Sequence, residues 1–225
     1  MTNKLLDTFF SKQFENKINM KMMNYDYMVP INDINEYIQK IINIPIIDFV
    51  NYVKDNYLND EVILSSKDAI QFSSFVNTNK NILLKIKMKG DKGFQFKDIG
   101  KFLLDDNIPR KDGAYTKYGE NHAKTAEYFG LLYNLKNTYF LSCIGYVYNN
   151  LTEDDQTKLL TRLILRTNFL IKIVLILQKN NCNMREIFSM LSDSTYYRRK
   201  SNIKFIIKYL ITNNIELIFL DNIQF

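Results

Sequence analysis

Apolar residues recur at helical spacing twice in the first quarter of the chain, with polar residues between them. The first set follows an Asn-Asp pair that can begin a helix, and it consists of Ile34, Ile38, Ile41 and Ile42. The second set follows a proline and consists of Phe49, Val50 and Val53. Residues 82–88 (ILLKIKM) instead alternate apolar and basic side chains, which predicts a strand. We therefore expect residues 1–90 to form a mostly helical domain with some extended structure.

A turn at Gly90–Gly93 separates this part from a more specific pattern, and we interpret it as a domain boundary. A short amphipathic helix is predicted after the turn, with apolar positions at Phe96, Ile99, Phe102 and Leu103. The polar segment 105–113 predicts a second turn, and residues 114–129 predict a second helix. Gly130 stands directly after that helix, where a glycine in the left-handed conformation commonly caps the helix end.

A short β-hairpin is predicted next, because the apolar segments 131–133 and 139–141 flank the polar residues 134–137. Helix, turn, helix and hairpin, in this order, are elements of a winged helix. We therefore expect residues 91–150 to form a first winged-helix domain.

One long helix, from about Glu153 to Lys179, is expected within a connecting segment at 151–183. Its most apolar stretch, 163–177, contains two basic residues and is too short and too charged to span a bilayer. Residues 1–21 also lack the basic, apolar and small-residue order of a signal peptide. We therefore expect a cytoplasmic protein that has no membrane segment.

The same order of elements is predicted again at the C-terminus. Residues 184–191 predict a short helix, and Ser192–Asp193–Ser194 predicts a turn whose side chains can cap the helix that follows. That helix, at 195–213, carries apolar residues on one side, namely Ile203, Ile206, Ile207 and Leu210. With a strand predicted at 215–220, residues 184–225 are expected to form a second winged helix. The predicted fold is mainly α with short β-hairpins (α+β), with two winged-helix domains after a mostly helical N-terminal domain.

Composition excludes several classes of protein. Of 225 residues, 46% are hydrophobic, and only 7 Gly and 3 Pro are present, which excludes a disordered or collagen-like chain. The two cysteines, Cys143 and Cys182, are too few for a disulfide framework, and no close Cys/His cluster offers a zinc site. We expect both to behave as small apolar side chains in a reducing compartment.

The net charge of +6 is unevenly distributed along the chain. Residues 80–124 contain 11 basic and 6 acidic side chains, and residues 185–208 contain 6 and 2. Both basic segments include predicted helix-turn-helix elements, so both are candidate surfaces for phosphate. Two solvated helix faces would give the same charge pattern.

The second helix of a helix-turn-helix enters the major groove of DNA, and the residues near its start face the bases. Around the first such helix we select Arg110, Lys111, Tyr115, Thr116, Lys117, Asn121 and Lys124, with Glu120 among them. In the second helix we select Ser194, Thr195, Tyr197, Arg198, Arg199, Ser201, Asn202 and Lys204. Asn can bond adenine and Arg can bond guanine through two hydrogen bonds, whereas Lys, Ser, Thr and Tyr more often contact phosphates.

Each of these residues also has a simpler interpretation. Winged helices also mediate protein contacts, and a polar outer face is normal for a surface helix. Tyr115 and Tyr118 can pack against neighbouring side chains. One of Arg198 and Arg199 can brace its own domain instead of reaching DNA.

Residues 110–131 (RKDGAYTKYGENHAKTAEYFGL) resemble a winged-helix segment of type II restriction endonucleases and related restriction-system proteins. The C-terminal part looks like the second winged helix of the same proteins, with a leucine-serine turn, a serine-threonine cap, two arginines and an apolar helix. The resemblance extends over residues 91–225. It implies the target-recognition part of such a system, which binds a short DNA sequence while a separate metal-dependent nuclease domain or subunit cleaves.

A nuclease site would need an aspartate upstream of a Glu/Asp-x-Lys triplet, because two carboxylates hold Mg²⁺ and the lysine helps to activate water. Glu15–Asn16–Lys17 fits the triplet, but no aspartate precedes it at a suitable distance. A looser group, which we interpret as an exposed acidic face, consists of Asp48, Asp55, Asp60, Glu61 and Lys67. The only histidine, His122, lies in a predicted recognition helix, where we expect it to pack or to hydrogen-bond at the helix face. We assign no catalytic or metal-binding residue.

The sequence thus favours a sequence-specific double-stranded DNA-binding module or subunit of a type II restriction system, with no cofactor of its own. Its partners would be DNA and either a nuclease domain or subunit or a second copy of the chain. The first alternative is a complete small type II restriction endonuclease that uses Mg²⁺ at a site in the N-terminal domain. The second is a winged-helix transcription regulator, which would dimerise to read a palindrome.

Overall fold

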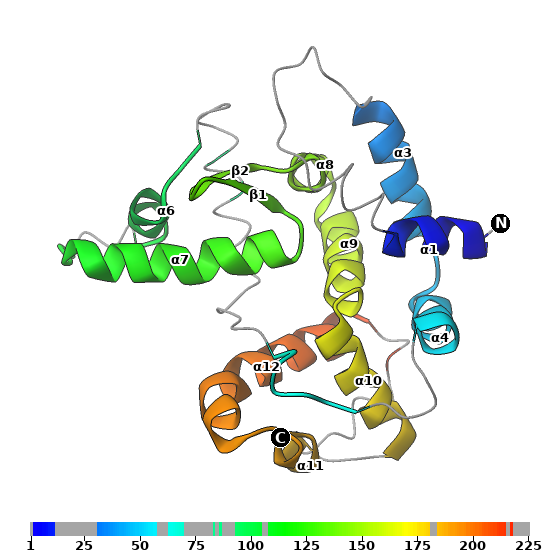
Figure 1. Ribbon diagram of the computed structural model, residues 1–225. Coiled ribbons are helices and arrows are strands. Elements are labelled where there is room, and N and C mark those ends of the chain that lie inside the picture. Colours follow the sequence, from blue (N-terminus) through cyan, green and yellow to red (C-terminus); the bar gives the residue numbers. More distant parts are fainter. Residues whose placement is uncertain are drawn as a thin grey trace. The chain divides into compact units, whose positions relative to one another are not determined.

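Figure 1 shows the computed structural model, which describes residues 2–11, 31–57, 63–69, 83, 86, 93–104, 108–180, 184–214 and 217. These residues are mainly helical and include one two-stranded antiparallel sheet, which confirms the predicted helical α+β class. Two compact units divide the chain: a C-terminal unit of Met1–Leu6, Ile41–Phe72 and Thr157–Phe225, and a central unit of Asp7–Lys40 and Ser73–Gln156. Each unit combines segments that are distant in sequence. The predicted domain limits at 90, 150 and 183 stay predictions.

The two N-terminal helical stripes form helices as predicted. Three helices lie in this part of the chain, namely α1 (Thr2–Phe10), α3 (Ile31–Ile42) and α4 (Ile46–Tyr57). All seven apolar residues of the two predicted stripes are buried. Pro45 lies just before α4, and its carbonyl accepts a helical hydrogen bond from Phe49 N at 3.1 Å. A proline suits this end of a helix because its missing N–H would have no helical partner there.

The strand predicted for 82–88 is wrong where the structure describes it. Leu83 and Ile86 are helical, and both are buried. Residues three apart share one face of a helix, so the apolar positions of this segment satisfy helical spacing as well as alternation. The Leu83 carbonyl accepts a hydrogen bond from Asn149 Nδ2 at 3.0 Å, and this contact belongs to the central unit.

The next two helices, α6 (Phe96–Leu103) and α7 (Asp112–Tyr128), confirm the predicted helix pair and cross with their backbones in contact (Figure 1). A Cβ atom on Gly100 would lie 1.9 Å from the Tyr115 carbonyl oxygen. A Cβ atom on Gly119 would lie 1.8 Å from the Phe96 carbonyl oxygen. Such an approach requires glycine at both positions.

The beginning of α7 lies two residues before the predicted start, because Asp112 and Gly113 are already helical. Asp112 is in the first turn, where a carboxylate interacts favourably with the helix dipole. It also forms an ion pair with Lys97 of α6 at 2.5 Å, which lowers the pKa of the Asp112 carboxyl.

Gly130 ends α7 as predicted. Its φ angle is 74°, which is the left-handed conformation that favours glycine. Gly130 N donates to the Glu127 carbonyl and Leu131 N donates to the Ala126 carbonyl, both at 2.8 Å. These two hydrogen bonds are those of a Schellman cap.

The predicted hairpin is confirmed and consists of β1 (Leu132–Leu135) and β2 (Thr138–Leu141), which pair in antiparallel register. Its turn is shorter than predicted, since only Lys136 and Asn137 connect the strands, with φ angles of 50° and 62°. Two left-handed residues in a row are typical of a type I′ turn. Phe94, which lies outside both strands, forms an isolated antiparallel bridge with Tyr139 of β2. The Phe94 N–H donates to the Tyr139 carbonyl at 3.0 Å, and the Tyr139 N–H donates to the Phe94 carbonyl at 2.9 Å.

A helix that the sequence pattern did not predict, α8, follows at Cys143–Asn150. Its N-cap is Ser142, whose Oγ accepts a hydrogen bond from Gly145 N at 2.9 Å. The same hydroxyl donates to the Gly130 carbonyl at 2.5 Å, which holds the start of α8 at the end of α7. A Cβ atom on Gly145 would lie 2.1 Å from the Leu131 carbonyl oxygen, so this contact is also close.

The single long helix predicted for 153–179 is wrong, because two helices, α9 (Glu153–Leu165) and α10 (Asn168–Asn180), occupy this range. They are separated at Thr167, whose Oγ1 donates to the Ile164 carbonyl at 2.6 Å. A threonine hydroxyl that bonds the backbone locally competes with helix continuation. None of the helices among the described residues is long and apolar enough to cross a membrane.

A buried arginine holds α9 within the C-terminal unit. Arg162 is only 4% exposed. Its Nη2 donates to the Ile44 carbonyl, which lies between α3 and α4, and its Nη1 donates to the Lys158 carbonyl at 2.9 Å. Two backbone carbonyls therefore accept hydrogen bonds from this buried charge.

The C-terminal helix pair is confirmed as α11 (Met184–Ser189) and α12 (Asp193–Asn213). All four apolar residues predicted for the inner side of α12 are buried. The N-cap of α12 is Ser192, but its side chain makes no capping hydrogen bond to the helix backbone, and its Oγ donates to Thr195 Oγ1 at 3.0 Å instead. The backbone N–H of Ser192 donates to Ser66 Oγ at 2.7 Å. Of the strand predicted at 215–220, the structure describes Leu217, which is in a 3₁₀ turn, so the prediction is wrong at that residue. The rest of it lies outside the described residues.

Replacing Gly119 with Ala is expected to lower the free energy of unfolding by about 2 kcal/mol or more, because the added methyl group overlaps the Phe96 backbone. Urea denaturation followed by circular dichroism measures this loss. The matched control is Gly113→Ala in the same helix, where a Cβ atom meets no other atom within 4 Å. Equal free energies for both variants would show that α6 and α7 do not depend on this contact.

Candidate nucleic-acid interface

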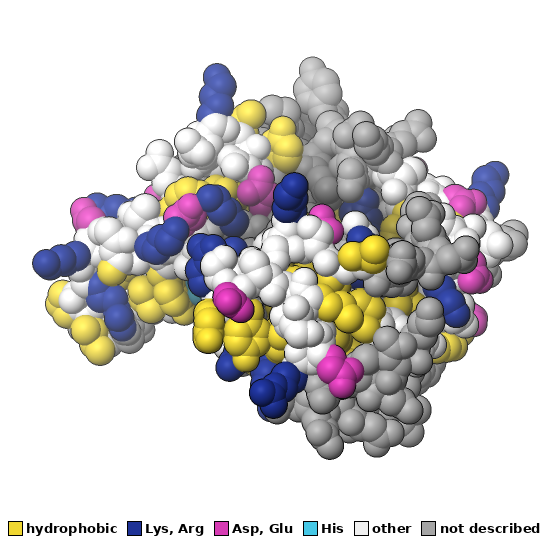
Figure 2. Space-filling view, turned by 60° about the horizontal axis from the view of Figure 1, so that its bottom comes forward, with side chains coloured by type: hydrophobic (Ala, Val, Ile, Leu, Met, Phe, Trp, Pro, Cys, Tyr) yellow, Lys and Arg dark blue, Asp and Glu magenta, His cyan; other side chains and the backbone are white. Residues whose placement is uncertain are grey.

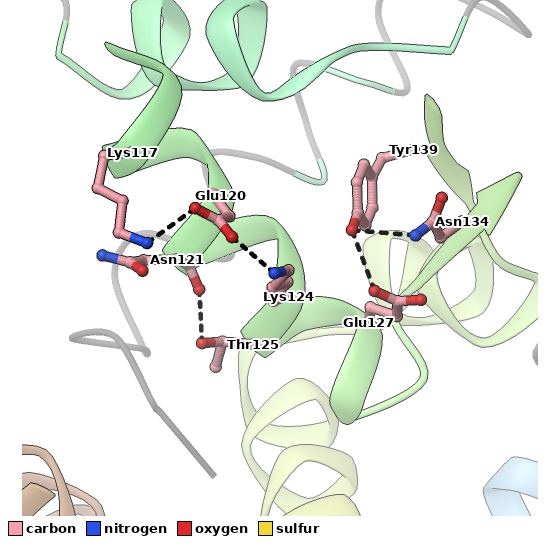
Figure 3. Close-up of polar contacts among 8 residues, drawn as sticks. All are labelled: Lys117, Glu120, Asn121, Lys124, Thr125, Glu127, Asn134 and Tyr139. Carbon is pink, nitrogen blue, oxygen red and sulfur yellow. Dashed lines mark hydrogen bonds and ion pairs between the residues drawn. The ribbon is translucent and has the colours of Figure 1, made fainter. Parts of the chain in front are cut away.

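The outer face of α7 carries the polar residues predicted for the first recognition helix. The inner side of the helix is buried at Gly119, His122, Ala123, Thr125 and Ala126. On the opposite side, four polar residues lie along one stripe, which we call the α7 stripe: Lys117, Glu120, Asn121 and Lys124 (Figure 3). Helical spacing of three and four residues places all four on one face. The lysines are exposed, whereas Glu120 and Asn121 are partly buried.

Glu120 pairs with both lysines of the α7 stripe (Figure 3). Its Oε2 lies 2.9 Å from Lys117 Nζ, and its Oε1 lies 2.6 Å from Lys124 Nζ. The hydrogen bond from Lys124, followed by that from Lys117, lowers the pKa of the Glu120 carboxyl. Glu120 is therefore ionised at neutral pH and offsets one of the two positive charges of the stripe.

The segment before α7 carries Arg110 and Lys111, and both are exposed. Tyr115, in contrast, holds this segment in place. Its hydroxyl accepts from Arg110 N at 3.2 Å and donates to the Ile108 carbonyl at 3.4 Å. The exposed Thr116 bonds the Asp112 carbonyl at 2.9 Å. The simpler interpretation, that Tyr115 packs within the fold, therefore describes its position.

A polar network that sequence reasoning missed joins the C-terminal part of α7 to the hairpin (Figure 3). The Tyr139 hydroxyl donates to Glu127 Oε2 at 3.2 Å and accepts from Asn134 Nδ2 at 3.1 Å. Burial, followed by the neighbouring Glu127 carboxylate, raises the pKa of Tyr139 well above its usual range. The phenol is therefore neutral and can donate. No sequence signal pairs these residues, because Tyr139 and Glu127 are twelve positions apart.

His122 packs against the body of the protein as expected. It is 2% exposed, and its ring lies 4.4 Å from that of Tyr118 between centroids. Its Nδ1 is buried without a hydrogen-bond partner in the described structure. Burial lowers the pKa of His122 to about 4, so the imidazole is neutral at pH 7.

The residues predicted on α12 divide into an exposed and a partly buried group. Exposed are Ser194, Tyr197, Arg198 and Ser201, and partly buried are Thr195, Arg199, Asn202 and Lys204. Tyr197 is the most prominent, with 76% of its surface exposed. Its ring lies 5.1 Å from that of Tyr196, which itself accepts a hydrogen bond from Lys200 Nζ at 3.1 Å.

The structure distinguishes the two adjacent arginines of α12. Arg198 is exposed, and its Nε donates to the Ser194 carbonyl at 3.1 Å, which leaves the rest of the guanidinium facing solvent. Arg199 is partly buried, with Nε and Nη1 shielded from solvent and without hydrogen-bond partners in the described structure. Burial, followed by the charge of Arg198, lowers the pKa of Arg199. Arg198 is therefore the arginine that can reach a ligand.

Basic side chains on the face shown in Figure 2 are spread between hydrophobic and polar ones, with acidic side chains among them. Exposed lysines and arginines on α7, and separately those on α12, can attract phosphate locally.

The residues considered for a nuclease site are only partly described. Asp48, Asp55 and Lys67 are exposed. The triplet Glu15–Asn16–Lys17, and Asp60 with Glu61, lie outside the described residues. Among the described residues, no three His, Cys, Asp or Glu side chains gather closely enough to hold a metal ion.

No protein-family model, curated protein or solved structure matches this chain. Its function has to be inferred from its own residues and contacts.

The pKa of His122 predicts a pH dependence of stability. The unfolded chain binds a proton near the ordinary pKa of 6.5, whereas the folded chain does so only near 4. Stability from this group is therefore complete above pH 6.5, decreases as the pH falls towards 4 and is constant below that, with a total loss of about 3 kcal/mol.

Urea unfolding of the wild type and of His122→Phe between pH 7.5 and 4, compared at each pH, measures this effect. The difference in free energy of unfolding between the wild type and His122→Phe should change over this pH range, because the two proteins share all other titrating groups. NMR provides a second readout, because the single histidine of the chain gives one assignable ring signal. A ring signal that titrates near 6.5 would contradict the burial of His122.

Proposed function

We propose that this chain binds double-stranded DNA in a sequence-specific manner, with α7 as a recognition helix. The observation that carries the proposal is the order and contact of the elements around α7. The extended residue Phe94 precedes α6, the turn and α7, and it bridges to β2 of the hairpin that follows. An extended residue, two helices and a two-stranded wing in this order are typical of a winged helix, and we propose that they belong to a winged-helix domain at residues 91–150.

The α7 stripe suits the major groove of DNA. The groove is about 12 Å wide and admits one α-helix. Asn121 lies between the two lysines along the stripe and can bond an adenine through its amide, while Lys117 and Lys124 can reach phosphates. Because Tyr139 and Glu127 join the hairpin to α7, the wing holds a defined position relative to this helix.

In the C-terminal unit, α11 and α12 supply a second helix-turn-helix, and α12 is proposed as its recognition helix. Residues 193–208 contain five basic side chains and one acidic one. Exposed Arg198 can bond a guanine or a phosphate, and Ser194 and Ser201 lie on the same outer side of the helix. Tyr197 adds an aromatic ring with a hydroxyl that can contact a phosphate.

The biological setting that we propose is the target-recognition module or subunit of a type II restriction system. It rests on the resemblance of residues 91–225 to the recognition part of such proteins. In this setting a separate nuclease domain or subunit cleaves the DNA, and Mg²⁺ belongs to that partner.

Incubation of the purified chain with a library of randomised duplexes, with and without Mg²⁺, tests the proposal when bound and cut pools are both sequenced. Enrichment of one short site without cutting supports a recognition module. Cutting near the site that requires Mg²⁺ would make the chain a complete endonuclease, and a palindromic site bound by a dimer without cutting would favour a regulator. Absence of any enriched site would contradict DNA recognition by α7 and α12.

Asn121→Ala and Arg198→Ala are each expected to reduce discrimination at one base pair by about 1–3 kcal/mol, because each removes a pair of hydrogen bonds to a base. Competition binding against single-base variants of the selected site measures the effect. The control is Asn213→Ala, because Asn213 is exposed near the end of α12 and its amide already bonds the Tyr209 carbonyl. If both variants keep the wild-type preference, these helices do not read bases.

A further inference from the structure

A carboxylate at the centre of the α7 stripe is unexpected on a surface that binds a polyanion. Glu120 is held from both sides along the helix, by Lys117 one turn before it and by Lys124 one turn after it (Figure 3). Its side chain is 24% exposed, compared with 66% for Lys117 and 56% for Lys124. The carboxylate is therefore the least exposed and most central charge of the stripe.

From this geometry we infer that Glu120 determines specificity: it repels DNA phosphate from α7 and accepts a hydrogen bond from the amino group of a cytosine. The inference rests on the proposed function and adds the class of base that the stripe selects. Glutamate accepting from cytosine N4 is an established kind of major-groove contact.

The two ion pairs leave Glu120 able to accept a further hydrogen bond. Each carboxylate oxygen has two lone pairs, and each bonds only one lysine here. In the free chain the two lysines hold the side chain along the stripe. Asn121 is the next residue along α7 and is also partly buried, so the stripe carries a carboxylate and an amide at consecutive positions.

The same arrangement disfavours nonspecific binding. Exposed ion pairs contribute little to stability, so Lys117 and Lys124 can turn away from Glu120 and reach phosphates on either side. Glu120 then loses both partners as water is displaced from the groove. A cytosine amino group at this position replaces them, whereas a base that offers only acceptors, or a phosphate, leaves the carboxylate unpaired. Discrimination between bases therefore comes from the free-energy cost of leaving the Glu120 carboxylate unpaired when the base opposite it cannot donate a hydrogen bond.

The test compares binding of wild type, Glu120→Gln and Glu120→Asp to the selected site, to variants with the contacted cytosine replaced, and to an unrelated duplex. Glu120→Gln keeps the size of the side chain and removes its charge. It is expected to bind unrelated DNA several-fold more tightly and to lose about tenfold in preference for cytosine at one position. Glu120→Asp keeps the charge but shortens the reach, so it should lose the preference without gaining nonspecific affinity.

The matched control is Glu36→Gln. Glu36 lies on α3, is exposed and pairs with Lys40 four residues later at 2.6 Å, so this variant removes the same charge from the same kind of ion pair. It should leave the preference for cytosine unchanged. A general effect of net charge would instead raise the affinity of both Gln variants equally and would overturn the inference.

Failure of the inference is distinguishable from failure of the proposed function. Wild-type protein that binds no duplex at low salt would overturn both. Wild-type protein with a defined site, together with Glu120→Gln that prefers the same base at every position, would overturn the role of Glu120 alone. A uniform loss of affinity in Glu120→Gln, with preference unchanged, would also overturn it and would show that Glu120 only positions the two lysines.

Discussion

The backbone contact between α6 and α7 is the constraint on which the rest of the candidate interface depends. Two glycines, Gly100 and Gly119, allow the helices to cross without side chains between them. The crossing fixes which side of α7 faces inward, and helical geometry then places Lys117, Glu120 and Lys124 outward. Asp112 and Lys97 add an ion pair between the two helices at the start of α7.

The hairpin extends the same arrangement. A Schellman cap at Gly130 redirects the chain directly into β1, and Tyr139 of β2 bonds Glu127 on the last turns of α7. Tyr139 also bridges to Phe94, which lies two residues before the start of α6. One residue of the hairpin therefore contacts both ends of the helix-turn-helix segment, so the helix, the turn and the wing are held together as one structure.

The two helices proposed to face DNA differ in their electrostatics. On α7 a central carboxylate offsets part of the lysine charge. The affinity of this surface for DNA therefore depends on which chemical group lies opposite the carboxylate. On α12 the acidic residue, Asp193, lies at the helix start, and the sequence of residues 198–208 contains basic residues and no Asp or Glu. The first surface is suited to discrimination and the second to attraction of phosphate.

Much of the secondary structure could be predicted from spacing alone. The stripes of α3, α4 and α12 repeat every three to four residues over enough length to exclude a strand, and Gly130 marks a helix end that requires a left-handed residue. Spacing does not distinguish helix from strand in a short segment such as 82–88, because its apolar positions satisfy both helical spacing and strand alternation. The helix break at Thr167 and the start of α8 at Ser142 depend on hydrogen bonds of single hydroxyl groups, which hydrophobic spacing does not reveal.

By itself, the sequence determined the helical character of the chain, the order of helix, turn, helix and hairpin, and the candidate polar faces of α7 and α12. These follow from local spacing and capping, which involve residues close together along the chain. Only the tertiary structure decided the burial of Arg162, the inward position of Arg199 and the network of Tyr139. Most of these depend on groups brought together from distant parts of the chain, because burial and polar pairing are set by what packs against a residue.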